Sequence, residues 1–209
     1  MRLVLASNNA KKLAELQLLF APLDVEIVAQ GTLGVAEADE PHHTFIENAL
    51  AKARHAAAHT GSAAIADDSG LCVAALGGAP GVASAHYAAV PIAAAEREAR
   101  RAEQDAANNA LLLHRLQGVT DRRARYVSVL VALRGADDPE PLVTAGRWEG
   151  EVLAAPRGGG GFGYDPLIHI RALGRSVAEL DAATKNAHSH RALAAGAMLA
   201  AMREAWQLG

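Results

Sequence analysis

Cysteine and long apolar runs are nearly absent from this chain. Cys72 is the single cysteine, so no disulfide can form within one chain, which suits a reducing compartment. No apolar run approaches the roughly 20 residues of a membrane-spanning helix, and the apolar residues 3–6 are too few for a secretory signal. We therefore expect a cytoplasmic protein with no membrane partner.

An excess of basic residues is also absent. The chain has 20 Lys and Arg against 23 Asp and Glu, a formal net charge of −3. This balance provides no broad positive field, so we expect no stable nucleic-acid partner, although a small phosphate ligand is compatible with it. The length of 209 residues predicts one domain over residues 1–209, built as a single two-lobed unit.

Two adjacent carboxylates, Asp67 and Asp68, stand in an apolar stretch and are followed by Ser69 and a glycine. Carboxylates in apolar surroundings are costly unless cations or hydrogen-bond donors compensate them. Oxygen ligands suit Mg²⁺, so one interpretation is a metal site at the carboxyl end of a strand over residues 63–66. The alternative is a strand-end turn in which Asp and Ser bond their own backbone.

A polar segment with two lysines lies between a predicted strand over residues 3–6 and a predicted helix carrying Leu13, Leu16 and Phe20. Backbone N–H groups at a helix N-terminus favour phosphate, and lysines there oppose the helix dipole unless an anion binds. Ordinary capping by Ser7 or Asn9 is the alternative. The candidate phosphate-binding residues are Ser7, Asn8, Asn9, Ala10, Lys11 and Lys12.

Several acids precede the next predicted helix, and any of them is a possible second metal ligand or a solvated side chain: Glu37, Asp39, Glu40 and Glu47. Glu47 also completes a capping box with Thr44 at the start of that helix, which explains it structurally. Lys52 lies one turn after Asn48 among alanines and has few local partners. Lys52 is therefore the better functional candidate on this helix.

The second half of the chain contains a predicted helix over residues 92–116 and a predicted hairpin with strands at 125–134 and 142–148. Glycines at 158–161 then lead into residues 162–165, where Phe162 or Tyr164 could stack on a flat ligand. A plain turn at Asp165 is the alternative.

Three cationic or titratable side chains lie near the C-terminus: Lys185, His190 and Arg191. Ser189 is the expected N-cap of a final helix, so His190 and Arg191 begin at a positively polarised helix start. There they would face an anion or an acceptor, or simply lie on the surface. The guanidinium of Arg191 can read carbonyl or phosphate oxygens.

Six segments together, in this order, resemble the inosine triphosphate pyrophosphatase family: residues 7–12, 45–49, 66–71, 77–81, 162–166 and 189–191. Each segment alone is weakly specific, whereas the ordered set covers nearly the whole chain. The resemblance implies an α/β fold with a mixed sheet in two lobes and a central active-site cleft. It also implies Mg²⁺-dependent hydrolysis of (d)ITP and XTP to the monophosphate and pyrophosphate by a homodimer.

The resemblance also assigns roles to residues. Residues 7–12 would hold the triphosphate, and Glu40 would be the second metal ligand. Asp68 would be the general base or the carboxylate that orients the water, and also a metal ligand. Ser69 would contact the substrate, with Asp67, Lys52 and Glu47 as supporting residues. The expected base pocket consists of Phe162, Gly163, Tyr164 and Asp165, and the purine's keto edge would be read by Lys185, His190 and Arg191.

Two features depart from the family pattern. His86 stands where relatives often carry arginine, and the arginine-rich helix around residues 96–101 is longer than expected. Two other functions compete with the pyrophosphatase: a Maf-type enzyme acting on pyrimidine or modified nucleotides, and a nucleotide sensor without catalysis. Residues 162–165 and 189–191 disfavour the first, and the Asp67 and Asp68 pair disfavours the second.

Overall fold

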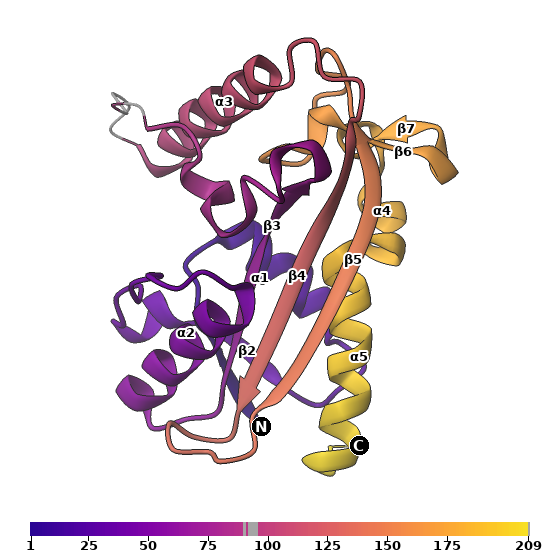
Figure 1. Cartoon of the computed structure of the whole chain (residues 1–209). Helices are drawn as coiled ribbons and strands as arrows, with labels where there is room; N and C mark the ends of the chain where they lie inside the picture. Colours follow the sequence, from indigo (N-terminus) through magenta and orange to yellow (C-terminus); the bar gives the residue numbers. More distant parts are fainter. Residues whose placement is uncertain (90, 92–95, 209) are drawn as a thin grey trace. The chain divides into compact units, whose positions relative to one another are not determined.

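The computed structural model describes residues 1–89, 91 and 96–208. Seven strands form one mixed sheet in the order β2-β1-β3-β4-β5-β6-β7, which confirms the predicted α/β class (Figure 1). The chain forms two compact units. Unit 1 comprises Met1–Ser69, Ser128–Arg147 and His188–Gly209, and unit 2 comprises Gly70–Val127 and Trp148–Ala187.

Unit 1 begins with the predicted strand and helix, followed by a second strand. Its strands and helices are β1 (Arg2–Leu5), α1 (Ala10–Leu19), β2 (Glu26–Ala29), α2 (Phe45–Thr60) and α5 (His190–Ala205). Strand β1 pairs in parallel with β2, with Leu3 opposite Ile27, and with β3, with Val4 opposite Ala64. The predicted N-caps of α2 and α5 are confirmed, because Thr44 Oγ1 accepts from Glu47 N and Ser189 Oγ accepts from Ala192 N.

The core of unit 1 joins α1 and α5 to the sheet. Leu16 and Phe20 of α1 pack with Met198 and Met202 of α5 and with apolar side chains of β1 to β4. Full burial of such a side chain stabilises the fold by about 1.5–3 kcal/mol. The apolar side chains of α5 are thus part of this core. Gly146 in β5 permits this contact, since a Cβ there would clash with the backbone of α5 at His190.

Strand β3 (Ala64–Val73) corrects the prediction for the acidic motif. We expected a strand that ended before Asp67, whereas the strand continues through Asp67 and Asp68, so neither a strand-end site nor a turn forms there. Successive side chains of a strand point to opposite faces, so the two carboxylates are directed to different surroundings. Side chains on each face of the strand pair with the two carboxylates, so the backbone stays extended through both residues.

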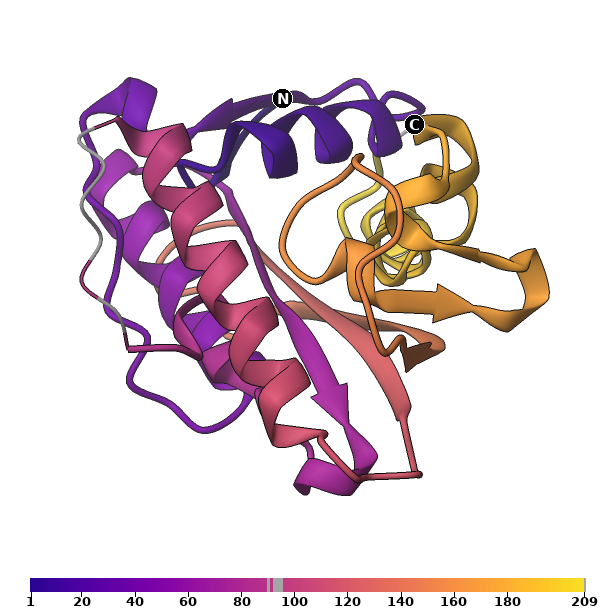
Figure 2. The same ribbon diagram turned by 90° about the horizontal axis from the view of Figure 1, so that it is seen from above.

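Unit 2 contains α3 (Arg97–Arg115), which Figure 2 shows as one unbroken helix. The predicted helix over residues 92–116 is confirmed from residue 97, and its residues 92–95 lie outside the described residues. Unit 2 also contains α4 (Ala182–His188), β6 (Ile168–Ile170) and β7 (Arg175–Ser176). Strand β6 pairs antiparallel with β5 and with β7. Its separate core includes Leu112, Tyr126, Trp148 and Leu167.

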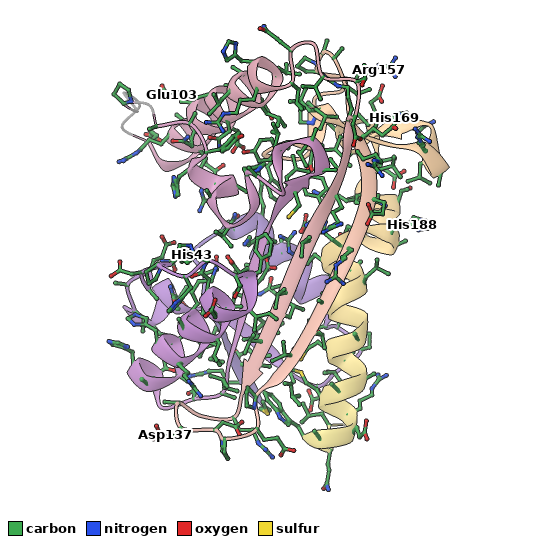
Figure 3. The ribbon with its side chains drawn as sticks, viewed as in Figure 1. His43, Glu103, Asp137, Arg157, His169 and His188 are labelled. Carbon is green, nitrogen blue, oxygen red and sulfur yellow. The ribbon has the colours of Figure 1, made fainter. Side chains whose placement is uncertain are left out.

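The predicted hairpin is formed by β4 (Arg123–Leu133) and β5 (Leu142–Val152), which run beside each other in Figure 1. In the turn between them, Asp138 accepts backbone hydrogen bonds from Arg134 N at 2.8 Å and Glu140 N at 3.0 Å. Asp137, labelled in Figure 3, lies exposed in the same turn. Across residues 1–89, 91 and 96–208, no helix has the length and apolar composition required to cross a membrane.

Candidate active site

Asp67 lies in unit 1, is 1% exposed and is surrounded by donors. Its Oδ1 accepts from Ser128 Oγ at 2.8 Å, and its Oδ2 accepts from Lys12 Nζ at 2.9 Å and Arg191 Nη2 at 3.0 Å. Burial raises the pKa of Asp67, but Arg191 and Lys12 outweigh it and hold the pKa well below its ordinary value. Asp67 is therefore a buried, fully paired carboxylate.

Arg191, 2% exposed, connects Asp67 to α1. Its guanidinium forms an ion pair with Glu15 and donates to Ser69 Oγ at 3.1 Å. Burial lowers the pKa of Arg191, yet the carboxylates of Asp67 and Glu15 raise it above its ordinary value. The surface position considered for Arg191 is therefore wrong. His190, 7% exposed, is buried as well.

Asp68 also lies in unit 1 and is 6% exposed, but it has one cation where Asp67 has two. Lys52 Nζ lies 2.7 Å from Asp68 Oδ1 and 3.0 Å from Glu40 Oε2. Burial raises the pKa of Asp68 to about 6; Lys52 opposes this shift, and the charge of Glu40 adds to it. Two carboxylates thus share a single buried ammonium group.

Glu40 belongs to a loop that α2 holds in place. Asn48, 1% exposed, accepts from His42 N at 3.0 Å and donates to His42 O at 3.2 Å. Both backbone groups of His42 are thereby fixed two residues after Glu40. The burial of Asn48 and Lys52 on α2 agrees with the prediction that they share one face, and this face directs the loop and its acid toward Asp68.

The residues around Asp68 fit a hard divalent cation. Asp68 Oδ2 is buried and receives no hydrogen bond from the described residues, so one carboxylate oxygen remains available close to Glu40. Mg²⁺ typically takes one or two protein carboxylates and completes its shell with water and substrate phosphates. Within the described part of the chain, no group of three or more His, Cys, Asp or Glu side chains could hold a metal on protein ligands alone.

Residues 7–12 adopt the predicted loop and helix start. Asn9 is the N-cap of α1, since its side chain accepts from Lys11 N and Lys12 N, and Ser7 Oγ accepts from Asn9 N at 3.2 Å. Capping is therefore present at this helix start. Asn8 packs directly against Gly31, where any Cβ would clash with the amide. Ala10 and Lys11 are exposed in the first turn, where phosphate binding stays a prediction.

Glu47 stands apart from the Asp68 cluster in the contacts it makes. Its carboxylate accepts from Thr44 Oγ1 at 2.6 Å, and its side chain is exposed at the start of α2. The structural explanation for Glu47 is thus confirmed. Glu37 and Asp39 are exposed, and Glu40 is the acid that shares Lys52 with Asp68.

Asp165 is the centre of a second polar cluster, in unit 2, and is 4% exposed. It accepts from Tyr126 Oη at 3.0 Å, Lys185 Nζ at 3.0 Å and Phe162 N at 3.0 Å. Burial and the charge of Asp165 raise the pKa of Tyr126 well above its ordinary value, which keeps the phenol a donor. Lys185 Nζ also lies 4.4 Å from the centroid of the Phe162 ring, a cation–π contact.

The rest of residues 162–165 is fixed by other parts of unit 2. Gly163 N donates to Asp105 at 2.7 Å, Gly163 O accepts from Asn109 Nδ2 at 3.0 Å, and Tyr164 Oη donates to Ser84 O at 2.9 Å. The segment therefore has a defined conformation beyond the plain turn considered at Asp165. His86, which departs from the family pattern, is exposed at the end of a 3₁₀ helix (Gly81–His86).

The predicted residues gather in both units. In unit 1 they form two networks, one on each face of β3: Asp67 with Lys12, Ser69 and Arg191, and Asp68 with Lys52 and Glu40. Unit 2 contains Phe162, Gly163, Tyr164, Asp165 and Lys185. The joint action of Lys185, His190 and Arg191 on one purine stays a prediction.

Sequence reasoning missed several members of these clusters: Glu15, Asp105, Asn109, Tyr126 and Ser128. Ser128 carried a usable signal, because it is the only hydroxyl in the apolar run of β4 after Tyr126. Asp105 and Asn109 resembled ordinary solvated residues of a charged helix. Nothing local distinguished them from their neighbours.

Comparison with known proteins identifies the family of this chain. The model of the Ham1 family matches residues 3–201. A dITP/XTP pyrophosphatase of Methylibium petroleiphilum is 73% identical over 99% of both chains, and one of Leptothrix cholodnii is 69% identical over 100% of both. The structure of a HAM1 protein from Coxiella burnetii has a TM-score of 0.85 and 40% identity, covering 98% of this chain and 99% of that chain. This chain belongs to the Ham1 family.

Proposed function

We propose that this protein is a pyrophosphatase that hydrolyses dITP, ITP, dXTP and XTP to the nucleoside monophosphate and pyrophosphate, and so removes deaminated purines from the nucleotide pool. The observation that carries the proposal is Asp68, a buried carboxylate with a pKa of about 6, one oxygen on Lys52 and the other without a donor. Relatives named dITP/XTP pyrophosphatase match the whole chain.

Asp68 is the general base in this proposal. It accepts the proton of a water molecule that attacks the α-phosphorus, and pyrophosphate leaves. A base whose pKa lies just below neutral pH is ionised under working conditions and still accepts a proton effectively. Lys52 holds Asp68 Oδ1 at 2.7 Å and so fixes the carboxylate that receives the proton.

Asp68 and Glu40 are the residues that would hold Mg²⁺, with the remaining ligands from water and phosphate. When bound, the ion would neutralise charge on the phosphate oxygens. Lys11 and Lys12, with the backbone of residues 7–10, would bind the triphosphate at the start of α1. Ser69, one residue after Asp68, would contact the substrate as well.

The cluster around Asp165 supplies base recognition in the proposal. Phe162, Gly163 and Tyr164 would line the pocket, and Lys185, with His190 and Arg191 from the other cluster, would donate to the 6-oxo group of the purine. The 6-amino group of adenine would leave such donors unpaired, and unpaired buried donors discriminate strongly.

Pyrophosphate release from dITP, XTP, GTP, dTTP and ATP, each with and without Mg²⁺, tests the proposal. We expect the highest kcat/KM for dITP and XTP, only with Mg²⁺. A preference for dTTP would support the Maf-type function, and binding of dITP without release would support the sensor. Either result would replace the proposal.

We also propose a homodimer, which sedimentation of the purified protein would detect.

A further inference from the structure

We propose that Asp105 and Asn109 on α3 are positioning residues that set base selectivity by fixing the two peptide groups of Gly163. This inference rests on the proposed function, in which residues 162–165 line the base pocket. Neither residue is a predicted contact of the substrate. Both belong to a helix whose charged residues looked, from the sequence, like a solvated face.

The two side chains hold consecutive peptide planes. Asp105 Oδ2 accepts from Gly163 N at 2.7 Å, which fixes the peptide between Phe162 and Gly163. Asn109 Nδ2 donates to Gly163 O at 3.0 Å, which fixes the peptide between Gly163 and Tyr164. Because Asp105 and Asn109 are four residues apart on α3, both lie on one face of the helix. Figure 2 shows α3 as one continuous helix.

No side chain at position 163 supplies this restraint. Gly163 has a φ of +62°, a left-handed conformation, and within the described residues no heavy atom would lie within 4 Å of a Cβ placed there. A glycine in open space can rotate its peptides at little steric cost. The hydrogen bonds from α3 act together with the one from Asp165 N to Phe162 O at 3.3 Å in orienting the segment at this point.

The residues on either side of Gly163 are anchored elsewhere in unit 2. Phe162 N donates to Asp165 at 3.0 Å, and Tyr164 Oη donates to Ser84 O at 2.9 Å. Rotation at Gly163 would thus be transmitted to the Phe162 ring, which lies under Lys185 Nζ at 4.4 Å. A change of this kind alters which base fits the pocket, and it leaves the phosphate-binding residues of unit 1 untouched.

A neighbouring pair on α3 has a different task. Asn108 accepts from Ala88 N at 2.9 Å and donates to Ser84 O at 3.2 Å, and Gln104 donates to Ala88 O at 2.8 Å. Gln104 and Asn108 therefore hold the segment around Ala88, whereas Asp105 and Asn109 hold Gly163. Substitutions of the second pair can be made without removing the contacts of the first.

The test measures kcat and KM for dITP and dATP in the Asp105→Ala, Asp105→Asn and Asn109→Ala variants. Glu103→Gln is the control, because Glu103 is an exposed acid on the same helix, labelled in Figure 3. Loss of a hydrogen bond to a buried polar group should lower kcat/KM for dITP about tenfold in each alanine variant, mainly through KM. The ratio of dITP to dATP turnover should fall with it.

Two further measurements separate positioning from loss of structure. Inhibition by tripolyphosphate, which has no base, should be unchanged in all variants, and Asp105→Asn should recover most of the selectivity because its amide oxygen still accepts from Gly163 N. Thermal unfolding verifies that each variant is folded.

The outcomes distinguish this inference from the proposed function. If the wild type fails to prefer dITP over dATP, the proposed function is wrong. If the wild type prefers dITP and both alanine variants keep its KM and its selectivity, the positioning inference is wrong. Equal losses for dITP and dATP, with weaker inhibition by tripolyphosphate, would also overturn it, since that pattern indicates general damage.

Discussion

The two faces of strand β3 give two chemically identical side chains, Asp67 and Asp68, different charged partners. On one face Asp67 meets two cations, Lys12 and Arg191, and a hydroxyl from Ser128. On the other face Asp68 pairs with a single cation among the described residues, Lys52, and shares it with Glu40. Both carboxylates are buried, yet the pKa of Asp67 is held well below its ordinary value and that of Asp68 is raised to about 6.

The number of cations near each carboxylate decides this difference between the two pKa values. Burial raises the pKa of either aspartate, and a lowered pKa requires enough positive charge to outweigh it. Asp67 has that charge and is suited to holding Lys12 and Arg191 in place. Asp68 lacks it and is suited to taking up a proton or a metal ion.

Replacement of Asp68 by Asn tests the catalytic side and should have the largest effect. Loss of the base and of one metal ligand should lower kcat for dITP on the order of a hundredfold or more, measured by pyrophosphate release. The matched control is Asp137→Asn in the exposed turn between β4 and β5, which should retain full activity. Near-normal turnover by the Asp68 variant would remove Asp68 from the proposed mechanism.

Replacement of Asp67 by Asn tests the structural side. Arg191 would keep only Glu15 as a charged partner while remaining buried, and breaking such a buried pair typically costs about 3–5 kcal/mol in the free energy of unfolding. Urea unfolding in EDTA measures this value. An unchanged unfolding free energy would contradict the structural role, whereas Asp137→Asn should lie within about 0.5 kcal/mol of the wild type.

The pH dependence of stability sharpens the contrast. The folded-state pKa of Asp68, about 6, lies above its ordinary value of 3.8, so the protonated form favours folding. Its stabilisation is fully present below about pH 4 and is lost as the pH rises through about 6.

Asp68→Asn imitates the protonated form and should therefore be more stable than the wild type at pH 7.5, by about 1–3 kcal/mol, in EDTA. The difference should narrow as the pH falls toward 4, which urea unfolding at a series of pH values would reveal. A wild type that is more stable than the variant at pH 7.5 would contradict the raised pKa. Asp67→Asn should instead be less stable than the wild type at pH 7.5. Because the pKa of Asp67 is lowered, its ionised form stabilises the fold, and this stabilisation is lost only at strongly acid pH.

Much of the fold could be predicted because periodicity and capping are local signals. The positions of β1, α2 and α5 follow from apolar spacing and from the caps Thr44 and Ser189. The end of β3 could not be predicted, since an Asp-Asp-Ser-Gly sequence normally favours a turn. Whether the strand continues depends on Lys12, Lys52 and Ser128, which are distant in sequence.

The site was predictable to a similar degree. The family resemblance indicated Asp68 and Glu40, the alanine-rich surroundings of Lys52 indicated that lysine, and the structure brings these three together. The partners Glu15 and Ser128 are selected by how elements pack, which no local pattern encodes. Asp105 and Asn109 were missed because a helical polar residue that holds a distant backbone looks the same in sequence as one that faces water.

Gly146 has a consequence for anyone who alters this protein. It carries no functional atom, but a Cβ there would meet the backbone of His190, the first residue of α5. Even alanine would displace the start of that helix and, with it, the guanidinium that joins Glu15 to Asp67. In a mutational scan, substitutions of Gly146 should therefore be as poorly tolerated as substitutions of Glu15, Asp67 and Arg191, none of which it contacts. A redesign of the protein should keep all four residues.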